Sequence, residues 1–267
     1  MSGPVGAARW VLLDAVAITG RDISHWVRRP LPVVVTLLFP VMTVVLFGYL
    51  LGGAINVPGA GNYFDYLLPG MFALTMAFGV EATMLTVITD AAKGVTDRFR
   101  SMPMASSAVV VGRCSADMLS SALGLLVLVG CGLAVGWRWH EGWAAAVAAV
   151  GLLLLLRLAL LWLGIYLGLL SKDPGAVIAV QILVWPLGFL SSAFVSPQTM
   201  PGWLGAIADW NPLSATANAA RELFGNPGWG GDSWMAEHSV LMAVVWPLVL
   251  IAVFAPLSVR RYRRLSR

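Results

Sequence analysis

The sequence predicts an all-α membrane protein with six transmembrane helices. Hydrophobic residues make up 59% of the 267 residues and charged residues only 11%, and the mean hydropathy is +0.82, whereas soluble domains carry about 25% charged residues. Only helices or closed barrels satisfy their backbone hydrogen bonds in hydrocarbon, and a crossing helix needs about 20 apolar residues. The long apolar runs favour helices at about residues 31–52, 66–89, 112–136, 143–170, 175–196 and 238–258.

Residues 1–30 are expected to form an amphipathic helix that lies in the membrane interface. Most charged residues gather on one side of a helical wheel, and six apolar residues gather opposite, although Trp10 and Ile18 break the pattern; the six are Leu12, Leu13, Val16, Ile23, Trp26 and Val27. Pro30 and Pro32 then end the helix before the first span. This segment is interpreted either as a simple anchor or as a lateral helix that also transmits motion. The six spans that follow, residues 31–258, are expected to form one domain.

The distribution of basic residues predicts the orientation of the chain. One side of the predicted membrane carries 14 of the 17 Lys and Arg residues, whereas the other side carries only Arg138 and Arg221, and Arg157 lies within a span. Because loops rich in Lys and Arg remain in the cytoplasm, both termini are expected there, with residues 259–267 as a basic tail of this multi-pass protein of the cytoplasmic membrane. The net charge of +4 therefore reflects topology and does not indicate nucleic-acid binding.

The cytoplasmic loop between the second and third spans combines charge, an aromatic residue and a helix breaker. Thr96 can cap a helical turn that ends before Pro103. Such a turn presents Phe99 as an apolar anchor with basic residues beside it, as a docking element for a cytoplasmic partner requires. A solvated loop that only fixes the topology is the alternative. The residues concerned are Thr96, Asp97, Arg98, Phe99, Arg100, Ser101 and Met102.

Two charged residues are expected at membrane depth, Glu81 in the second span and Arg157 in the fourth. An unpaired charge is costly in this position, so each side chain should face the bundle interior, a partner or a watery cavity. The two residues are interpreted either as interhelical polar contacts that fix the packing or as part of a translocation path.

The segment between the fifth and sixth spans is predicted to form short re-entrant or extracellular helices. Asn211 and Pro212 supply an N-cap and a first-turn proline, and Gly225 supplies a stop, which gives a helix of about 12 residues; another short helix begins near Trp203. Tryptophans in the predicted outer segments favour an aromatic belt over a ligand cage. They are Trp137, Trp139, Trp143, Trp203, Trp210, Trp229 and Trp234.

Several chemical functions receive no support from the sequence. No stretch fits the phosphate-binding pattern G-x-x-x-x-G-K-[ST], so we expect no ATP site on this chain. The three histidines are scattered without metal-ligand spacing, and no serine lies in a G-x-S-x-G motif. We therefore expect no cofactor, no metal and no catalytic residue on this chain, which is not an enzyme on its own.

The order of these features resembles the ABC-2 type exporter permeases, and within them the daunorubicin-resistance group of drug and lipid exporters. The resemblance runs nearly end to end. It rests on the interfacial helix, on YLLPG at residues 66–70, on TDRFRSMP at 96–103 continuing through Arg113, and on MPGWLGAIADWNPLSATANAARELFGN at 200–226.

The resemblance implies a permease that works with partners. Members have six spans, pair as a dimer of membrane subunits, either two copies or two homologues, and dock two copies of a separate ATPase that binds ATP and Mg²⁺. The coupling helix of the family corresponds to 97–102 in this sequence. The helices before the last span, with Trp203, Asn211, Pro212 and Arg221, correspond to the outer gate.

The implied function is outward transport of an amphiphilic drug or lipid across the cytoplasmic membrane, powered by the partner ATPase. Two alternatives remain open at this point. One is a proton-coupled secondary transporter that uses Glu81, and the other is a membrane scaffold that transports nothing.

Overall fold

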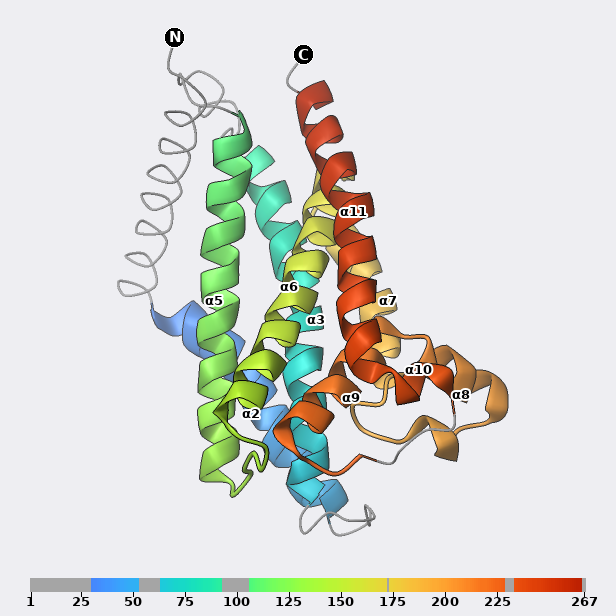
Figure 1. Cartoon of the computed structure of the whole chain (residues 1–267). Coiled ribbons are helices and arrows are strands. Elements are labelled where there is room, and N and C mark those ends of the chain that lie inside the picture. The colour runs from blue at the N-terminus through green and yellow to red at the C-terminus, as the bar shows by residue number, and fades with distance from the viewer. Residues whose placement is uncertain (1–29, 53–62, 93–105, 172, 229–232, 266–267) are drawn as a thin grey trace.

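The computed structural model describes residues 30–52, 63–92, 106–171, 173–228 and 233–265, and this part of the chain is helical with no strand. The helices form an elongated bundle (Figure 1). In chain order they are α2 (Pro30–Gly52), α3 (Tyr63–Ala92), α5 (Ser106–Ala134), α6 (Trp143–Leu170), α7 (Ala176–Phe189), the 3-10 helix η1 (Pro197–Thr199), α8 (Gly202–Asp209), α9 (Pro212–Phe224), α10 (Trp234–Glu237) and α11 (Ser239–Leu265).

The centre of the bundle is α3, which contacts α2, α5, α6, α7 and α9, while α6 also packs along α11. Glycines on α6 allow the close approach to α3. A Cβ atom at Gly164 would lie 2.9 Å from the carbonyl oxygen of Val80, and one at Gly168 would lie 2.7 Å from Cβ of Val87. Small residues at such crossings bring helix backbones together in membrane proteins.

The two ends of the bundle differ in character. At the upper end in Figure 1, α3 ends, α5 begins and α11 ends close to one another. At the lower end lie the connection from α5 to α6 and the short helices α8, α9 and α10. The segment predicted as re-entrant or extracellular therefore gathers at the end opposite to the basic C-terminal part of α11.

Four helices contain stretches that are long and apolar enough to cross a membrane, and α2 and α7 contain shorter apolar stretches. Long apolar faces of α2, α5, α7 and α11 are exposed, as expected for helices that contact lipid. The long helices are Tyr63–Ala92, Cys114–Ala134, Trp143–Leu170 and Ser239–Tyr262, and the shorter apolar stretches are Leu38–Leu50 and Ala176–Phe189.

The predicted span at 175–196 is helical only as far as Phe189. Pro186 and Gly188 lie in its last turn, where proline lacks an amide hydrogen and glycine adds backbone freedom. The Leu190 amide donates to the Pro186 carbonyl oxygen at 2.7 Å, and the Ser191 hydroxyl donates to Gly188 at 2.6 Å. These two bonds close the helix and turn the chain inward, so that residues 191–194 and 196 are buried.

The short helix predicted from Asn211 to Gly225 is confirmed as α9. The Asn211 side chain accepts a hydrogen bond from the Leu213 amide at 2.9 Å, Pro212 is the first helical residue, and Gly225 ends the helix with φ 66. The left-handed backbone at Gly225 is the usual helix stop. The short helix expected near Trp203 is confirmed as α8.

One tryptophan assigned to the aromatic belt is a core residue, so that part of the prediction is wrong. Trp137 is 0% exposed. Its ring packs edge-on against Phe72 and Phe224, and its Nε1 donates to the side chain of Asn226 at 2.9 Å. A buried indole with a satisfied N–H is a packing element. Other members of the set are exposed, as a belt requires, namely Trp143, Trp203, Trp210 and Trp234.

Two predicted elements lie outside the described residues. These are the interfacial helix, except for Pro30, and the docking turn at 96–102. They remain predictions.

Candidate functional site

The coupling residues named from the sequence fall between the described ends of α3 and α5. The structure describes α3 up to Ala92 and α5 from Ser106. The seven residues in question, Thr96, Asp97, Arg98, Phe99, Arg100, Ser101 and Met102, lie outside the described residues. What the structure does give is the pair of helices that lead into and out of this segment, and a polar network that joins them.

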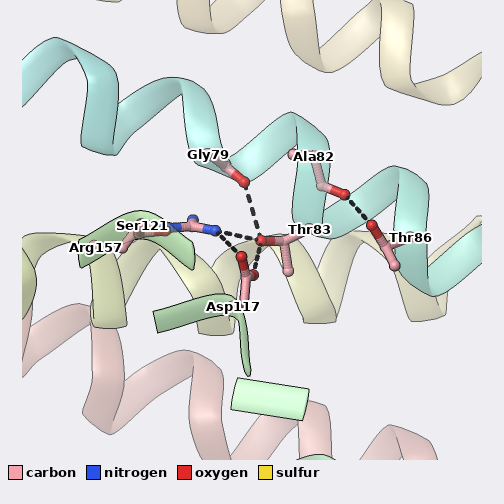
Figure 2. A network of polar contacts seen from close by, with 7 residues as sticks. All are labelled: Gly79, Ala82, Thr83, Thr86, Asp117, Ser121 and Arg157. Carbon is pink, nitrogen blue, oxygen red and sulfur yellow. Dashed lines mark hydrogen bonds and ion pairs between the residues drawn. The ribbon is translucent and has the colours of Figure 1, made fainter. Parts of the chain in front are cut away.

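That network is centred on Arg157 of α6, whose side chain is 1% exposed (Figure 2). Its Nη2 forms an ion pair with Oδ1 of Asp117 on α5 at 2.8 Å and donates to Oγ1 of Thr83 on α3 at 2.8 Å. Its Nε donates to Oγ of Ser121 at 2.8 Å. One arginine therefore holds three helices together.

Two further contacts complete this arginine network, defined as Arg157, Asp117, Thr83 and Ser121. The hydroxyl of Thr83 lies 2.5 Å from Oδ2 of Asp117. A Cβ atom at Gly79 would lie 2.5 Å from Cζ of Arg157, so only glycine leaves room for the guanidinium at this position. The ion pair compensates a charge that would otherwise be costly at membrane depth.

Asp117 is a member of the site that sequence reasoning missed. It lies five residues inside the predicted third span, close to Arg113, and was not counted as a charge at membrane depth. A carboxylate more than one turn inside an apolar span, together with a lone arginine in another span, was the available signal.

Glu81 does not contact Arg157. Gly79 and Thr83 face Arg157, and Glu81 lies between them in sequence, so a helical period of 3.6 residues directs it to another side of α3. Its Oε2 accepts a hydrogen bond from Nε2 of Gln181 on α7 at 2.9 Å. Its Oε1 is buried without a hydrogen-bond partner.

The second buried arginine, Arg221, lies in the last turn of α9 and is 2% exposed. Its Nε donates to the carbonyl oxygen of Tyr66 at 2.9 Å, and its Nη1 donates to Oδ1 of Asn218 at 2.8 Å. Its Nη2 donates to the carbonyl oxygens of Ser192 at 2.8 Å and Ala193 at 3.2 Å. Cζ lies 3.8 Å from the centroid of the Tyr66 ring. Carbonyl dipoles and the aromatic face thus stabilise this charge.

Arg221 and two tyrosines donate hydrogen bonds to the main-chain carbonyl oxygens of the turn that follows α7. The Tyr66 hydroxyl donates to the Ser192 carbonyl oxygen at 2.7 Å, and the Tyr63 hydroxyl donates to that of Phe194 at 3.1 Å. Non-helical backbone at membrane depth is tolerated only when other protein groups form hydrogen bonds with its amide and carbonyl groups. The carbonyls of three successive residues, 192–194, receive their partners from α3 and α9 in this way.

Two of the other residues assigned to the outer gate, Asn211 and Pro212, lie at the end of α7 and the start of α9. The amide of Asn211 donates to the Leu187 carbonyl oxygen of α7 at 2.8 Å, and Pro212 begins α9. Trp203 lies on α8 and is exposed. The structure therefore brings Asn211, Pro212 and Arg221 to the end of α7, while the side chain of Trp203 is exposed on α8.

No group of three or more His, Cys, Asp or Glu side chains that could hold a metal ion occurs within the described ranges. The polar groups that the helices bring together are hydrogen-bonded arginines, hydroxyls and carbonyls. Such groups are suited to holding helices together or to contacting a passing molecule.

Comparison with known proteins identifies the family. Residues 14–224 match the model of the ABC-2 type transporter family. The chain is 34% identical to the daunorubicin resistance ABC transporter permease protein DrrB1 of Streptomyces coeruleorubidus, over 91% of this chain and 83% of the relative. It is 22% identical to the probable doxorubicin resistance ABC transporter permease protein DrrC of Mycobacterium tuberculosis, over 100% and 94%. It is 27% identical to the putative transport permease ycf38 of Cyanophora paradoxa, over 85% and 80%. The chain belongs to the ABC-2 type transporter family and is similar to its drug-resistance permeases.

Proposed function

We propose that this chain is the membrane subunit of an ATP-driven exporter that moves an amphiphilic drug or lipid outward across the cytoplasmic membrane. The observation that carries the proposal is the family match over residues 14–224, which includes α2 to α9 of the apolar bundle. Permeases named for daunorubicin and doxorubicin resistance among the relatives support a drug-like substrate.

In the proposed topology the chain crosses the membrane six times, with both termini in the cytoplasm. α2, of 23 residues, supplies the first crossing, and α7, of only 14 residues, supplies the fifth. The orientation is supported by Arg260 and Arg261 near the end of α11, which lies at the same end of the bundle as the ends of α3 and α5 that flank 93–105. Basic residues of this kind remain on the cytoplasmic side.

The proposed assembly contains two membrane subunits and two ATPase subunits. The second membrane subunit is another copy of this chain or a homologue. ATP and Mg²⁺ bind to the ATPase subunits, because this chain has no phosphate-binding motif. Residues 96–102 dock on the ATPase, and α3 and α5 transmit their movement to the bundle.

The polar residues take two roles in this proposal. The network of Arg157 with Asp117 joins α3, α5 and α6 at Thr83, 13 residues before the coupling segment 96–102, and at Asp117, 15 residues after it, so it makes these helices move as one body. Arg221 fixes the turn after α7 at the outer gate. Glu81, with one unpartnered oxygen, is assigned to the translocation path.

The test is transport in vesicles that contain the full-length permease and its ATPase partner. The double substitution of Arg98→Ala and Phe99→Ala should abolish ATP-driven transport and the stimulation of ATPase activity by substrate, while leaving membrane insertion unchanged. Glu237→Ala, which removes an exposed charged residue on α10, is the control and should transport normally.

Three results would contradict the proposal. Undiminished coupling in the double variant would remove the docking role of 96–102. Transport that follows a pH gradient and ignores ATP would instead favour the secondary transporter that uses Glu81, and an absence of any transport with a bound ATPase would favour a scaffold.

A further inference from the structure

The exposed side of α11 changes from apolar to basic along its length. Its apolar stripe consists of five residues that are 37–52% exposed and recur mostly every three or four positions, as one side of a helix does. Three and seven residues after the last of them come Pro256 and Arg260, which are also exposed. The same side of the helix is therefore apolar for about four turns and then carries an arginine. The five residues of the α11 stripe are Leu241, Val245, Leu248, Val249 and Val253.

Contacts with α6 fix the rotation of α11. Ser258 is 1% exposed, and its hydroxyl donates to the Trp162 carbonyl oxygen at 3.3 Å. The Phe254 ring lies 5.6 Å from that of Tyr166. Arg260 follows Ser258 by two residues, or about 200° around the helix. Its exposed side chain therefore lies on the side of α11 that faces away from α6.

Arg260 begins a group of four arginines in the last turns of α11, which ends at Leu265. Their positions fall within about 160° of the helix circumference at 100° per residue. The whole of α11 contains no Asp or Glu, and within the described ranges neither Arg260 nor Arg261 forms an ion pair. Their charge is therefore available to an anion from outside the chain. We call the four the α11 arginine cluster, namely Arg260, Arg261, Arg263 and Arg264.

The length of α11 sets the depth of this cluster. Arg260 lies 21 residues after Ser239, about 31 Å at 1.5 Å per residue, which matches the hydrocarbon thickness of about 30 Å. Ser239 begins the helix at the outer end, where its hydroxyl donates to Oε2 of Glu222 at 2.8 Å. When Ser239 lies at one boundary of the hydrocarbon, Arg260 thus lies among the headgroups at the other, and the apolar stripe fills the distance between them.

We propose that the exposed side of α11 binds an anionic phospholipid of the cytoplasmic leaflet, with its headgroup phosphate at the α11 arginine cluster and an acyl chain along Val253 and Val249. This site is additional to the proposed transport function, and only the leaflet follows from the proposed topology. A guanidinium binds a phosphate through two parallel charge-assisted hydrogen bonds. Basic clusters directly beside a span attract anionic lipids.

Other occupants match this surface less well. A zwitterionic lipid covers the stripe, but its own cation offsets the phosphate charge that the arginines attract. A free phosphate or nucleotide meets the arginines and leaves the stripe bare. An acidic segment of a protein partner also suits the arginines, yet the stripe below them lies in the hydrocarbon, where only a lipid chain accompanies the charge. An anionic phospholipid alone matches both parts.

The experiment compares two lipids that share their acyl chains and differ in net charge, dioleoylphosphatidylglycerol and dioleoylphosphatidylcholine. Delipidated full-length permease in detergent micelles is titrated with each lipid, and bound lipid is counted by native mass spectrometry. We expect one phosphatidylglycerol per chain to bind at least about fivefold more tightly than phosphatidylcholine, the scale of one basic residue at an anionic surface. Equal affinity for the two lipids would overturn the proposal, and the arginines would then serve topology alone.

A third titration separates the lipid from its headgroup. Glycerophosphoglycerol carries the same phosphate without acyl chains, and we expect it to form no adduct at the concentrations at which the lipid binds. An adduct of equal affinity would overturn the role of the stripe and assign the cluster to a soluble phosphate compound.

Variants locate the lipid at the cluster. Arg260→Gln combined with Arg264→Gln should weaken phosphatidylglycerol binding about twentyfold, or about fivefold for each arginine, and leave phosphatidylcholine binding unchanged. Arg260→Lys with Arg264→Lys keeps the charge and should retain the preference for phosphatidylglycerol. Arg138→Gln removes an exposed arginine at the opposite end of the bundle and is the matched control, with binding as in the unaltered chain.

All variants are compared as folded protein, checked by thermal unfolding in the same micelles. An unchanged preference for phosphatidylglycerol in the double Gln variant, or an equal loss in Arg138→Gln, would refute the site. Equal binding of the two lipids together with loss of the ATPase from the purified complex in the double Gln variant would assign the cluster to a protein partner instead. The titration needs neither ATP nor transport, so its failure leaves the exporter untouched and failure of the exporter leaves the lipid site in place.

Discussion

The sharpest stability prediction concerns the unequal burial of the Arg157 and Asp117 side chains, which are 1% and 26% exposed. Asp117→Asn leaves the buried guanidinium without a counter-charge. Removing one partner of a buried pair costs about 3–5 kcal/mol, and we expect about 3 kcal/mol because water already screens the exposed part of the carboxylate. Arg157→Met removes the buried cation instead and leaves Asp117 with the Thr83 hydroxyl and water. We expect a loss of about 1–2 kcal/mol.

The double substitution gives the internal test. With both charges removed no buried cation is left unpaired, so Asp117→Asn combined with Arg157→Met should be about 1–2 kcal/mol more stable than Asp117→Asn alone. The free energy of unfolding is measured by denaturant titration of the purified full-length chain in mixed micelles. Glu141→Gln, an exposed carboxylate in the α5–α6 connection, serves as the control and should have no measurable effect.

Two outcomes would refute this reasoning. If Arg157→Met lowers the free energy of unfolding as much as Asp117→Asn does, the unequal burial of the two side chains does not determine the two losses. If the two effects add without coupling, the ion pair does not stabilise the folded chain.

Three further predictions are tested by the same titration. Arg221→Lys should cost about 2–3 kcal/mol, because a single ammonium cannot replace the planar fork of a guanidinium, whereas Tyr66→Phe removes one hydroxyl bond and should cost about 1 kcal/mol; equal losses would contradict the assigned role of Arg221. Gly79→Ala should destabilise the chain by about 1–3 kcal/mol, since its Cβ would lie 2.5 Å from Cζ of Arg157. Gly130→Ala, where nothing lies within 4 Å, should be neutral or stabilising, and a loss there equal to that at Gly79 would count against the steric explanation. Asn211→Ala should cost about 1 kcal/mol through the lost N-cap of α9, and no loss would show that the cap is replaced by other groups.

Elements with strong local signals were predictable from the sequence. The apolar runs indicated the helical class and the positions of the long helices. Asn211, Pro212 and Gly225 act within a few residues of the helix that they begin or end, which is why the bounds of α9 were predicted closely.

Contacts between distant residues were not predictable in this way. Arg157 and Asp117 are 40 residues apart, and only the packing of α5 on α6 brings them together. Trp137 is a tryptophan in a predicted outer segment, as a belt residue would be, but Phe72, Phe224 and Asn226 enclose it. Arg221 was interpreted as a loop charge, because three of its partners are main-chain carbonyl oxygens of distant residues, which carry no signal in the sequence.

The early end of α7 has a consequence for the lipid around the protein. Its 14 residues measure about 21 Å at 1.5 Å per residue, about 9 Å less than a typical hydrocarbon layer. In the proposed topology, lipids beside α7 must shorten or tilt to meet it, because a short span thins the adjacent bilayer. The membrane is then thinnest next to the turn at 190–196. An exported molecule that leaves the bilayer there crosses a shorter path through hydrocarbon.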